Sequence, residues 1–356
     1  MNNSLIVITT ITLLFLGGVY LIKEKSDSLA NLSEPISLSS LSILKKAPFS
    51  RFNSESTRAA DSKGLEIIQV NREGQLLQSS VSGGTKILQE GLGNISHVVW
   101  AKNEGSFIYK ADGPTGGSFY YDAKSRKTTP LHSQIGNIAF SPDKESIAYS
   151  FFDPGANEGS ISVGAPDGSS YKNIFKTRMN ELEIFWPQTN IIAFKPITSA
   201  SSPTDLFFVN IENKKLSRVI TSKIGLEILF SPSGKLILFS TFTPIGLELH
   251  LLDLDAGKEY IAPFPAFAKK CAFSPQETRV YCAVAENPPN EPIRSDYFSD
   301  SEAIMAWSPL DNQSEQLLGA TKYDRFQIKS PFLGNNGEDL FFINSRDNFV
   351  YRLHLN

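Results

Sequence analysis

The fold of this chain is decided by one ten-residue pattern, which is clearest in Phe230-Ser231-Pro232-Ser233-Gly234-Lys235-Leu236-Ile237-Leu238-Phe239. Gapless copies begin at positions 100, 140, 185 and 273, so that neighbouring copies start 40, 45, 45 and 43 residues apart. A looser copy begins at Lys329-Ser330-Pro331. A repeat of this length and content is typical of a β-propeller, in which each repeat forms one blade.

Each copy predicts a β-hairpin. In the copy that starts at position 140, Ile138 and Phe140 alternate along an inner strand, Pro142-Asp143-Lys144 supplies the turn, and Ile147 and Tyr149 resume the alternation. A third strand, a polar turn and a weak outer strand follow, which completes a four-stranded blade. Because one blade exposes two apolar faces, the blades must stack around an axis to bury them.

The motif also carries a family resemblance. Phe140-Ser141-Pro142-Asp143-Lys144 and the equivalent 230–234, each followed by a short β-forming run, resemble the WD40-like repeats of the TolB family. The resemblance covers about residues 55–355, and the Gly-His and Trp-Asp dipeptides of true WD40 blades are absent. It implies a propeller fold. TolB-like proteins are binding partners in bacterial envelope complexes, but residues 26–55 are too short to supply the separate amino-terminal domain of TolB, so the resemblance does not carry TolB's partners over to this chain.

We therefore expect an all-β propeller of four-stranded blades behind one N-terminal transmembrane helix. The expected parts are a membrane anchor (1–25), a Ser-rich linker (26–54) and the propeller (55–356). Residues 58–90 fit a degenerate first blade, and residues 326–355 fit a last blade with three strands. This gives seven blades, with six as the alternative. A strand within 43–49 would close the ring by completing the last blade.

The predicted anchor is an apolar run, Leu5 to Ile22, of 18 uncharged residues. At about 1.5 Å per residue it spans roughly 27 Å, near the thickness of the hydrocarbon core. A cleaved signal peptide is the alternative, but Met1 to Ser4 carries no Lys or Arg and no Ala-x-Ala site follows. Lys23 and Lys25 would keep the propeller in the cytoplasm by the positive-inside rule. A single anchor before a folded domain usually serves export, so we expect an extracytoplasmic propeller.

Composition excludes one class of partner. The 34 basic and 37 acidic residues give a net charge of −3 and a pI of about 5.9. Binding nucleic acid requires a clustered basic face, so we expect no nucleic-acid partner.

The 25 phenylalanines suit flat packing between blades. We expect a monomeric propeller.

Acidic side chains gather in the loops between the second and third strands, on the face of a propeller that usually carries the ligand site. A long insertion, 287–302, adds acidic and aromatic residues to this face as a lid, a plug or a partner contact. Ordinary turn chemistry is the alternative explanation of these residues. The candidate binding residues are Asp112, Asp153, Glu158, Asp205, Glu248, Asp296, Tyr297 and Phe298.

The two cysteines lie in one predicted hairpin. If Phe273 opposes Val280 across the turn, Cys271 opposes Cys282, at a separation that a disulfide can bridge. The same positions hold core residues in other copies, so two packed free thiols are the alternative.

Catalytic motifs are hard to find. The histidines, His97, His132, His250 and His354, lie on different blades without the spacing of a zinc site, and no Gly-x-Ser-x-Gly elbow occurs. We therefore expect no metal or other cofactor and a non-catalytic module that binds a protein, peptide or glycan through the acidic loop face. The alternative is a propeller hydrolase or lyase that uses carboxylates such as Asp153, Asp205 and Asp296, with Ca²⁺ as a conceivable cofactor.

Overall fold

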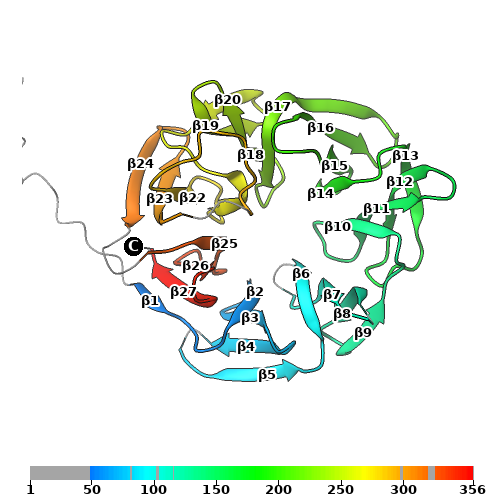
Figure 1. The fold of residues 1–356 in the computed structure, drawn as a ribbon, viewed down its shortest axis with the longest axis horizontal. Coiled ribbons are helices and arrows are strands. Elements are labelled where there is room, and N and C mark those ends of the chain that lie inside the picture. The colour runs from blue at the N-terminus through cyan, green and yellow to red at the C-terminus, as the bar shows by residue number, and fades with distance from the viewer. Residues whose placement is uncertain are drawn as a thin grey trace, which may run out of the picture. The chain divides into compact units, whose positions relative to one another are not determined.

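The computed structural model describes residues 49–80, 82–101, 104–114, 116–296, 300–319 and 325–355. Apart from the short 3-10 helix η2 (Ala268–Lys270), the regular structure of these residues is β, and the sheets lie in a ring around a central axis (Figure 1). The predicted anchor lies outside the described residues. Within the described ranges, no helix is long and apolar enough to cross a membrane.

The first half of the ring consists of four-stranded antiparallel sheets in chain order. The first sheet comprises β2 (Thr57–Lys63), β3 (Glu66–Asn71), β4 (Leu76–Ser80) and β5 (Thr85–Gln89). The second comprises β6 (Asn94–Trp100), β7 (Phe107–Asp112), β8 (Gly117–Asp122) and β9 (Lys127–Pro130). The third comprises β10 (Ile135–Phe140), β11 (Ile147–Asp153), β12 (Glu158–Gly164) and β13 (Lys172–Thr177).

A seven-stranded sheet and two further four-stranded sheets complete the ring. The seven-stranded sheet runs through β14 (Leu182–Gln188), β15 (Ile191–Pro196), β16 (Pro203–Asn210), β17 (Leu216–Phe230), β18 (Leu236–Thr243), β19 (Gly246–Asp253) and β20 (Lys258–Ile261). The next sheet holds β21 (Cys271–Phe273), β22 (Val280–Ala285), β23 (Glu302–Ser308) and β24 (Gln313–Leu318). The last holds β25 (Ile328–Leu333), β26 (Asp339–Asn344), β27 (Phe349–His354) and β1 (Phe49–Arg51).

The seven-stranded sheet owes its width to one long strand. The first part of β17 pairs with β16, as in Val209 opposite Leu216, and its last part pairs with β18, as in Phe230 opposite Ile237. The outer strand of one blade thus continues directly into the inner strand of the next.

The ring is closed by the two ends of the described chain. Strand β1 pairs antiparallel with β27, with Phe49 opposite Leu353. The Phe49 ring lies 5.1 Å from Phe326 and 5.3 Å from Tyr351, measured between ring centroids. The last blade therefore takes its fourth strand from the start of the propeller, as expected. Of the segment 43–49 that we expected to form this strand, only Phe49 is among the described residues.

The hairpins have the register that the repeat predicts. Ile138 lies opposite Tyr149, and Phe140 lies opposite Ile147. In the central copy Gly234 adopts φ 70°, and a Cβ there would lie 2.1 Å from the carbonyl oxygen of Pro187 in the preceding blade. The turn must therefore be glycine, because a side chain would collide with a neighbouring backbone. In the first blade β2 runs to Lys63, which lies opposite Glu66 at the start of β3.

Apolar side chains fill the space between neighbouring sheets. Ile161 of β12 and Ala148 of β11 belong to one buried cluster with Ile184 and Phe194 of the following sheet. Complete burial of a side chain as large as isoleucine or phenylalanine contributes roughly 1.5–3 kcal/mol to stability. Since each sheet is covered on both faces, the stacking that the repeats require is achieved.

Cys271 and Cys282 are directly opposed in the register of β21 and β22 and form a disulfide, with their Cα atoms 4.0 Å apart. Both are also buried in a cluster that includes Trp307. The pair is thus bridged and at the same time part of the core.

Reduction of this bridge is expected to lower the free energy of unfolding by about 2–4 kcal/mol, because the cross-link restricts the unfolded chain. Denaturant unfolding of the wild type with and without reductant measures the effect. A Cys271→Ala/Cys282→Ala variant is the control, since reductant should not change its midpoint. Equal midpoints for the wild type under both conditions would contradict the prediction.

Candidate functional site

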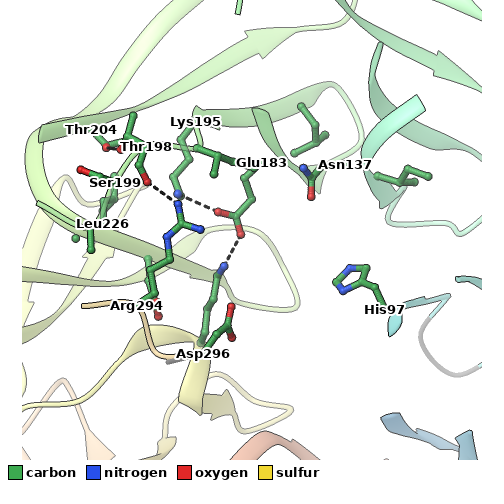
Figure 2. Close-up of a pocket in the computed structure, with 17 residues that line it drawn as sticks. His97, Asn137, Glu183, Lys195, Thr198, Ser199, Thr204, Leu226, Arg294 and Asp296 are labelled. Atoms are coloured by element: carbon green, nitrogen blue, oxygen red, sulfur yellow. Dashed lines mark hydrogen bonds and ion pairs between the residues drawn. The ribbon is translucent and has the colours of Figure 1, made fainter. Parts of the chain in front are cut away.

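A cavity of about 310 Å³ opens where the inner strands of several sheets approach the central axis (Figure 2). Its walls come from β6, β10, β14, β15, β16, β17 and η2, and from the loops between β15 and β16 and between β22 and β23. The polar side chains on these walls include both charges and a histidine. They are His97, Asn137, Glu183, Lys195, Thr198, Ser199, Thr204, Glu227, Lys269, Arg294 and Asp296.

Glu183 is held between two lysines. Its Oε2 lies 2.9 Å from the ammonium of Lys195, its neighbour on β15, and its Oε1 lies 2.8 Å from the ammonium of Lys269 in η2. Burial raises the pKa of the Glu183 carboxyl, but Lys269 and Lys195 outweigh it, so the pKa is lowered and the carboxylate is ionised at neutral pH. Figure 2 shows the two ion pairs side by side.

His97 on β6 faces these ion pairs from the other side of the cavity (Figure 2). Its imidazole is exposed to the open space of the cavity, although protein groups surround it closely enough to limit hydration. This desolvation, together with Lys269, Lys329 and Lys110, lowers the pKa of His97 below 6.5 and outweighs the opposing effect of Asp296. At neutral pH the ring is therefore neutral and able to accept a proton.

Glu227 on β17 is almost fully buried, with 6% of its surface exposed. Its Oε1 accepts hydrogen bonds from the backbone N–H and the hydroxyl of Ser295, both at 2.8 Å. Its Oε2 has no hydrogen-bond partner among the described residues. Burial raises the pKa of this carboxyl, an effect that Ser295 and Lys269 reduce without reversing. A buried carboxyl with a raised pKa is a candidate proton carrier.

The described part of the 287–302 insertion forms one wall of the cavity. Arg294 donates a hydrogen bond of 2.5 Å to the carbonyl oxygen of Thr198, and Asp296 also lines the cavity. Together with Ser295, Arg294 fastens this loop to the seven-stranded sheet. Tyr297 and Phe298, which we expected to form a lid, a plug or a partner contact, lie outside the described residues.

The predicted acidic residues do not gather at this site, with the exception of Asp296. Each of the others is engaged by a neighbour on its own blade, as turn chemistry and surface ion pairs commonly require. Their contacts are Ser96 Oγ with Asp112 (2.9 Å), Gly155 N with Asp153 (2.9 Å), Lys176 with Glu158 (3.8 Å), Arg218 with Asp205 (3.5 Å) and His250 with Glu248 (2.9 Å).

The residues that line the cavity do carry a sequence signal. Five of them stand two to four positions before the aromatic residue that begins each copy of the repeat. Four of the five lie on inner strands that are otherwise mostly apolar, and the fifth lies in η2, just before such a strand. Searching the loops alone overlooked this position, because hairpin alternation assigns an inner strand to the core. The residues concerned are His97, Asn137, Glu183, Glu227 and Lys269.

Comparison with known proteins identifies solved structures of similar fold. No family model and no curated protein matches the chain. An oligogalacturonate lyase in complex with manganese matches with a TM-score of 0.64 and 9% identity, over 87% of this chain and 93% of the lyase. An oligogalacturonate lyase from Vibrio parahaemolyticus matches with a TM-score of 0.64 and 8% identity, over 88% and 94%. The β-propeller domain of Cps50 (Swd1) from Myceliophteria thermophila matches with a TM-score of 0.59 and 10% identity, over 87% and 100%.

These similarities confirm the β-propeller fold. They overturn our expectation of a non-catalytic module that binds through an acidic loop face, because the two structures with a TM-score of 0.64 are lyases. The expectation that the chain is not an enzyme is corrected with it, since the names of these two structures agree better with the hydrolase or lyase alternative. That alternative used Asp153, Asp205 and Asp296 as its carboxylates. Asp296 lines the cavity, whereas Asp153 and Asp205 do not, so this choice of residues is corrected as well.

The manganese in one of the similar structures prompts a test of whether the cavity fits a metal ion. Both carboxylate oxygens of Glu183 already contact ammonium groups, which would repel a divalent cation. In the described ranges, no three His, Cys, Asp or Glu side chains come together in a way that could hold a metal ion. The described residues therefore do not fit Mn²⁺ or the Ca²⁺ that we considered from the sequence.

Glu227→Gln is expected to stabilise the protein at neutral pH. Glutamine keeps an oxygen acceptor for Ser295 but cannot ionise. Because the folded-state pKa is raised, the wild type loses stability as pH rises above the ordinary value of about 4.5. The gain in melting temperature of the variant should be absent below this pH and grow toward neutrality.

Melting temperatures of both proteins across this pH range test the prediction. Glu158→Gln, a change at an exposed carboxyl with 67% of its side chain accessible, is the matched control. A lower melting temperature of Glu227→Gln at neutral pH would show that the folded protein depends on the ionised carboxylate.

Proposed function

We propose that the protein is a propeller lyase that cleaves oligosaccharides of acidic sugars by β-elimination. The observation that carries this proposal is the arrangement of a neutral His97 opposite cationic side chains in one cavity. The lyase names of two similar folds support the same reaction class. A glycan was one of the ligand classes that the sequence led us to expect.

The reaction needs few groups. A base removes the proton from the carbon next to the sugar carboxylate, a C=C bond forms from that electron pair, and the C–O bond at the next carbon breaks. The departing oxygen takes a proton from water. His97 is the base in this scheme, because its ring is neutral and solvent-accessible.

Charge stabilisation is the second requirement. Negative charge builds up on the substrate carboxylate as the proton leaves, and fixed cations near that group lower the barrier. Lys269 and Arg294 are the cationic side chains on the cavity wall that are not fully buried. They come from η2 and the insertion, two elements that the closed ring brings to one place.

The activity test uses the purified protein and oligogalacturonides, with oligomers of other uronic acids in parallel. Elimination produces an unsaturated product that absorbs in the ultraviolet and whose mass lacks the water that hydrolysis would add. Cleavage without unsaturation would identify a hydrolase. If no oligo-uronate is cleaved, the lyase proposal is wrong.

His97→Gln is expected to lower kcat by at least about 100-fold with little change in KM, because the variant loses the general base. The lowered pKa of His97 should extend the activity of the wild type to lower pH than a histidine with an ordinary pKa would allow. His132→Gln, at an exposed loop histidine, is the control and should behave as the wild type. Full activity of His97→Gln would exclude His97 as the base.

The finer architecture is also a proposal. We infer seven blades, because the long strand β17 joins two four-stranded sets within one continuous sheet. Kinship with TolB-like repeats is supported by the Phe-Ser-Pro motif alone. A protein or peptide partner stays a prediction.

We propose, finally, that residues 1–25 anchor the propeller outside the cytoplasm. The apolar run Leu5 to Ile22 and the Cys271–Cys282 disulfide support this, because disulfides persist mainly in oxidising compartments. A single cysteine placed at 26–42 should react with a membrane-impermeant maleimide in intact cells. Labelling only after lysis would place the propeller in the cytoplasm.

A further inference from the structure

The ion pairs around Glu183 occupy a position in the cavity where a charged ligand would meet them. The lysines differ in access: 37% of the Lys269 side chain is exposed, against 10% of the Lys195 side chain. Lys195 is therefore a buried support for Glu183, whereas Lys269 presents its ammonium to the cavity.

Lys269 retains its charge in this environment. Burial lowers the pKa of its ammonium, but Glu183, Glu227 and Asp296 together outweigh burial, so the pKa is raised above 10.5. An ammonium group has three N–H donors, and Glu183 is the one ion-pair partner of Lys269 among the described residues. Donors thus remain for a ligand.

Glu183 determines where the Lys269 ammonium points. The Lys195–Glu183 pair ties β15 to β14 across the register of the sheet, and the second oxygen of the same carboxylate holds Lys269 at 2.8 Å. A second ion pair fixes the position of η2, because the ammonium of the buried Lys270 lies 2.5 Å from the carboxylate of the buried Glu302. The accessible cation is therefore held at a defined position rather than on a freely moving side chain.

We infer that Lys269, oriented by Glu183, does in this chain what a divalent cation does in metal-dependent carboxylate sites. It binds and neutralises the carboxylate of the acidic sugar, so that binding and elimination need no metal ion. The inference rests on the proposed function, and it explains why the walls of the cavity do not fit Mn²⁺ although a similar fold carries it.

Arg294 is the second donor to the same carboxylate. Its guanidinium gives one hydrogen bond to Thr198, and the fork of this group has further donors suited to a carboxylate. Asp296 and the ionised Glu183 limit the positive charge, which favours a ligand with a single carboxylate at this position over a polyphosphate.

The test measures binding apart from turnover. Digalacturonate is titrated into the full chain by calorimetry, using His97→Gln to prevent cleavage, with no addition, with EDTA and with Mn²⁺. We expect the same Kd in all three conditions and no saturable binding of Mn²⁺ alone. Binding that disappears with EDTA and returns with Mn²⁺ would overturn the inference while leaving the lyase proposal intact.

The residue is tested by Lys269→Met in the same background, which keeps the length of the side chain but removes the charge. Affinity for digalacturonate is expected to fall at least about tenfold, the value of one hydrogen bond to a charged group. Lys176→Met, at an exposed lysine, is the control and should bind as the parent. Unchanged affinity of a folded Lys269→Met would also overturn the inference. Cleavage of oligo-uronates by the wild type, measured separately, decides the lyase proposal.

Discussion

The pairing of β1 with β27 is the contact on which the rest of the structure depends, because it closes the ring of sheets. Each sheet buries apolar side chains on both faces, and it can do so only with a neighbour on each side. Without β1, strand β27 would be an open edge of the last sheet, and Phe326 and Tyr351 would lose their contacts with Phe49. Closure also forces the inner strands toward one axis, so residues far apart in sequence come to line one cavity.

Within that cavity the surroundings give similar groups different protonation states. Two lysines lower the pKa of Glu183, whereas burial raises the pKa of Glu227 in the same sheet. Desolvation and nearby lysines lower the pKa of His97. An ionised carboxylate, a carboxyl that resists ionisation and a neutral base thus stand on neighbouring walls. Such a separation of pKa values is what acid–base chemistry at neutral pH requires.

Local sequence rules predicted the hairpins well. The spacing around Pro142 predicted the register that pairs Ile138 with Tyr149, and the same rule placed Cys271 opposite Cys282. The same rules did not locate the cavity. Alternation along a strand shows which side chains share a face of the sheet, but not which of them lie beside the central axis of the ring. The acidic residues of the loops were candidates because of their residue type, yet Asp205 pairs with Arg218 and Glu158 with Lys176, each on its own blade.

The sequence by itself determined the repeat and the strand register within each blade. These features depend on contacts between residues close along the chain, which short patterns encode. Only the tertiary structure decided that Glu183 meets Lys269 and that His97 faces them across a cavity. Those contacts join different blades, and their geometry follows from the closed ring and the path of the insertion through Arg294, which no local pattern specifies.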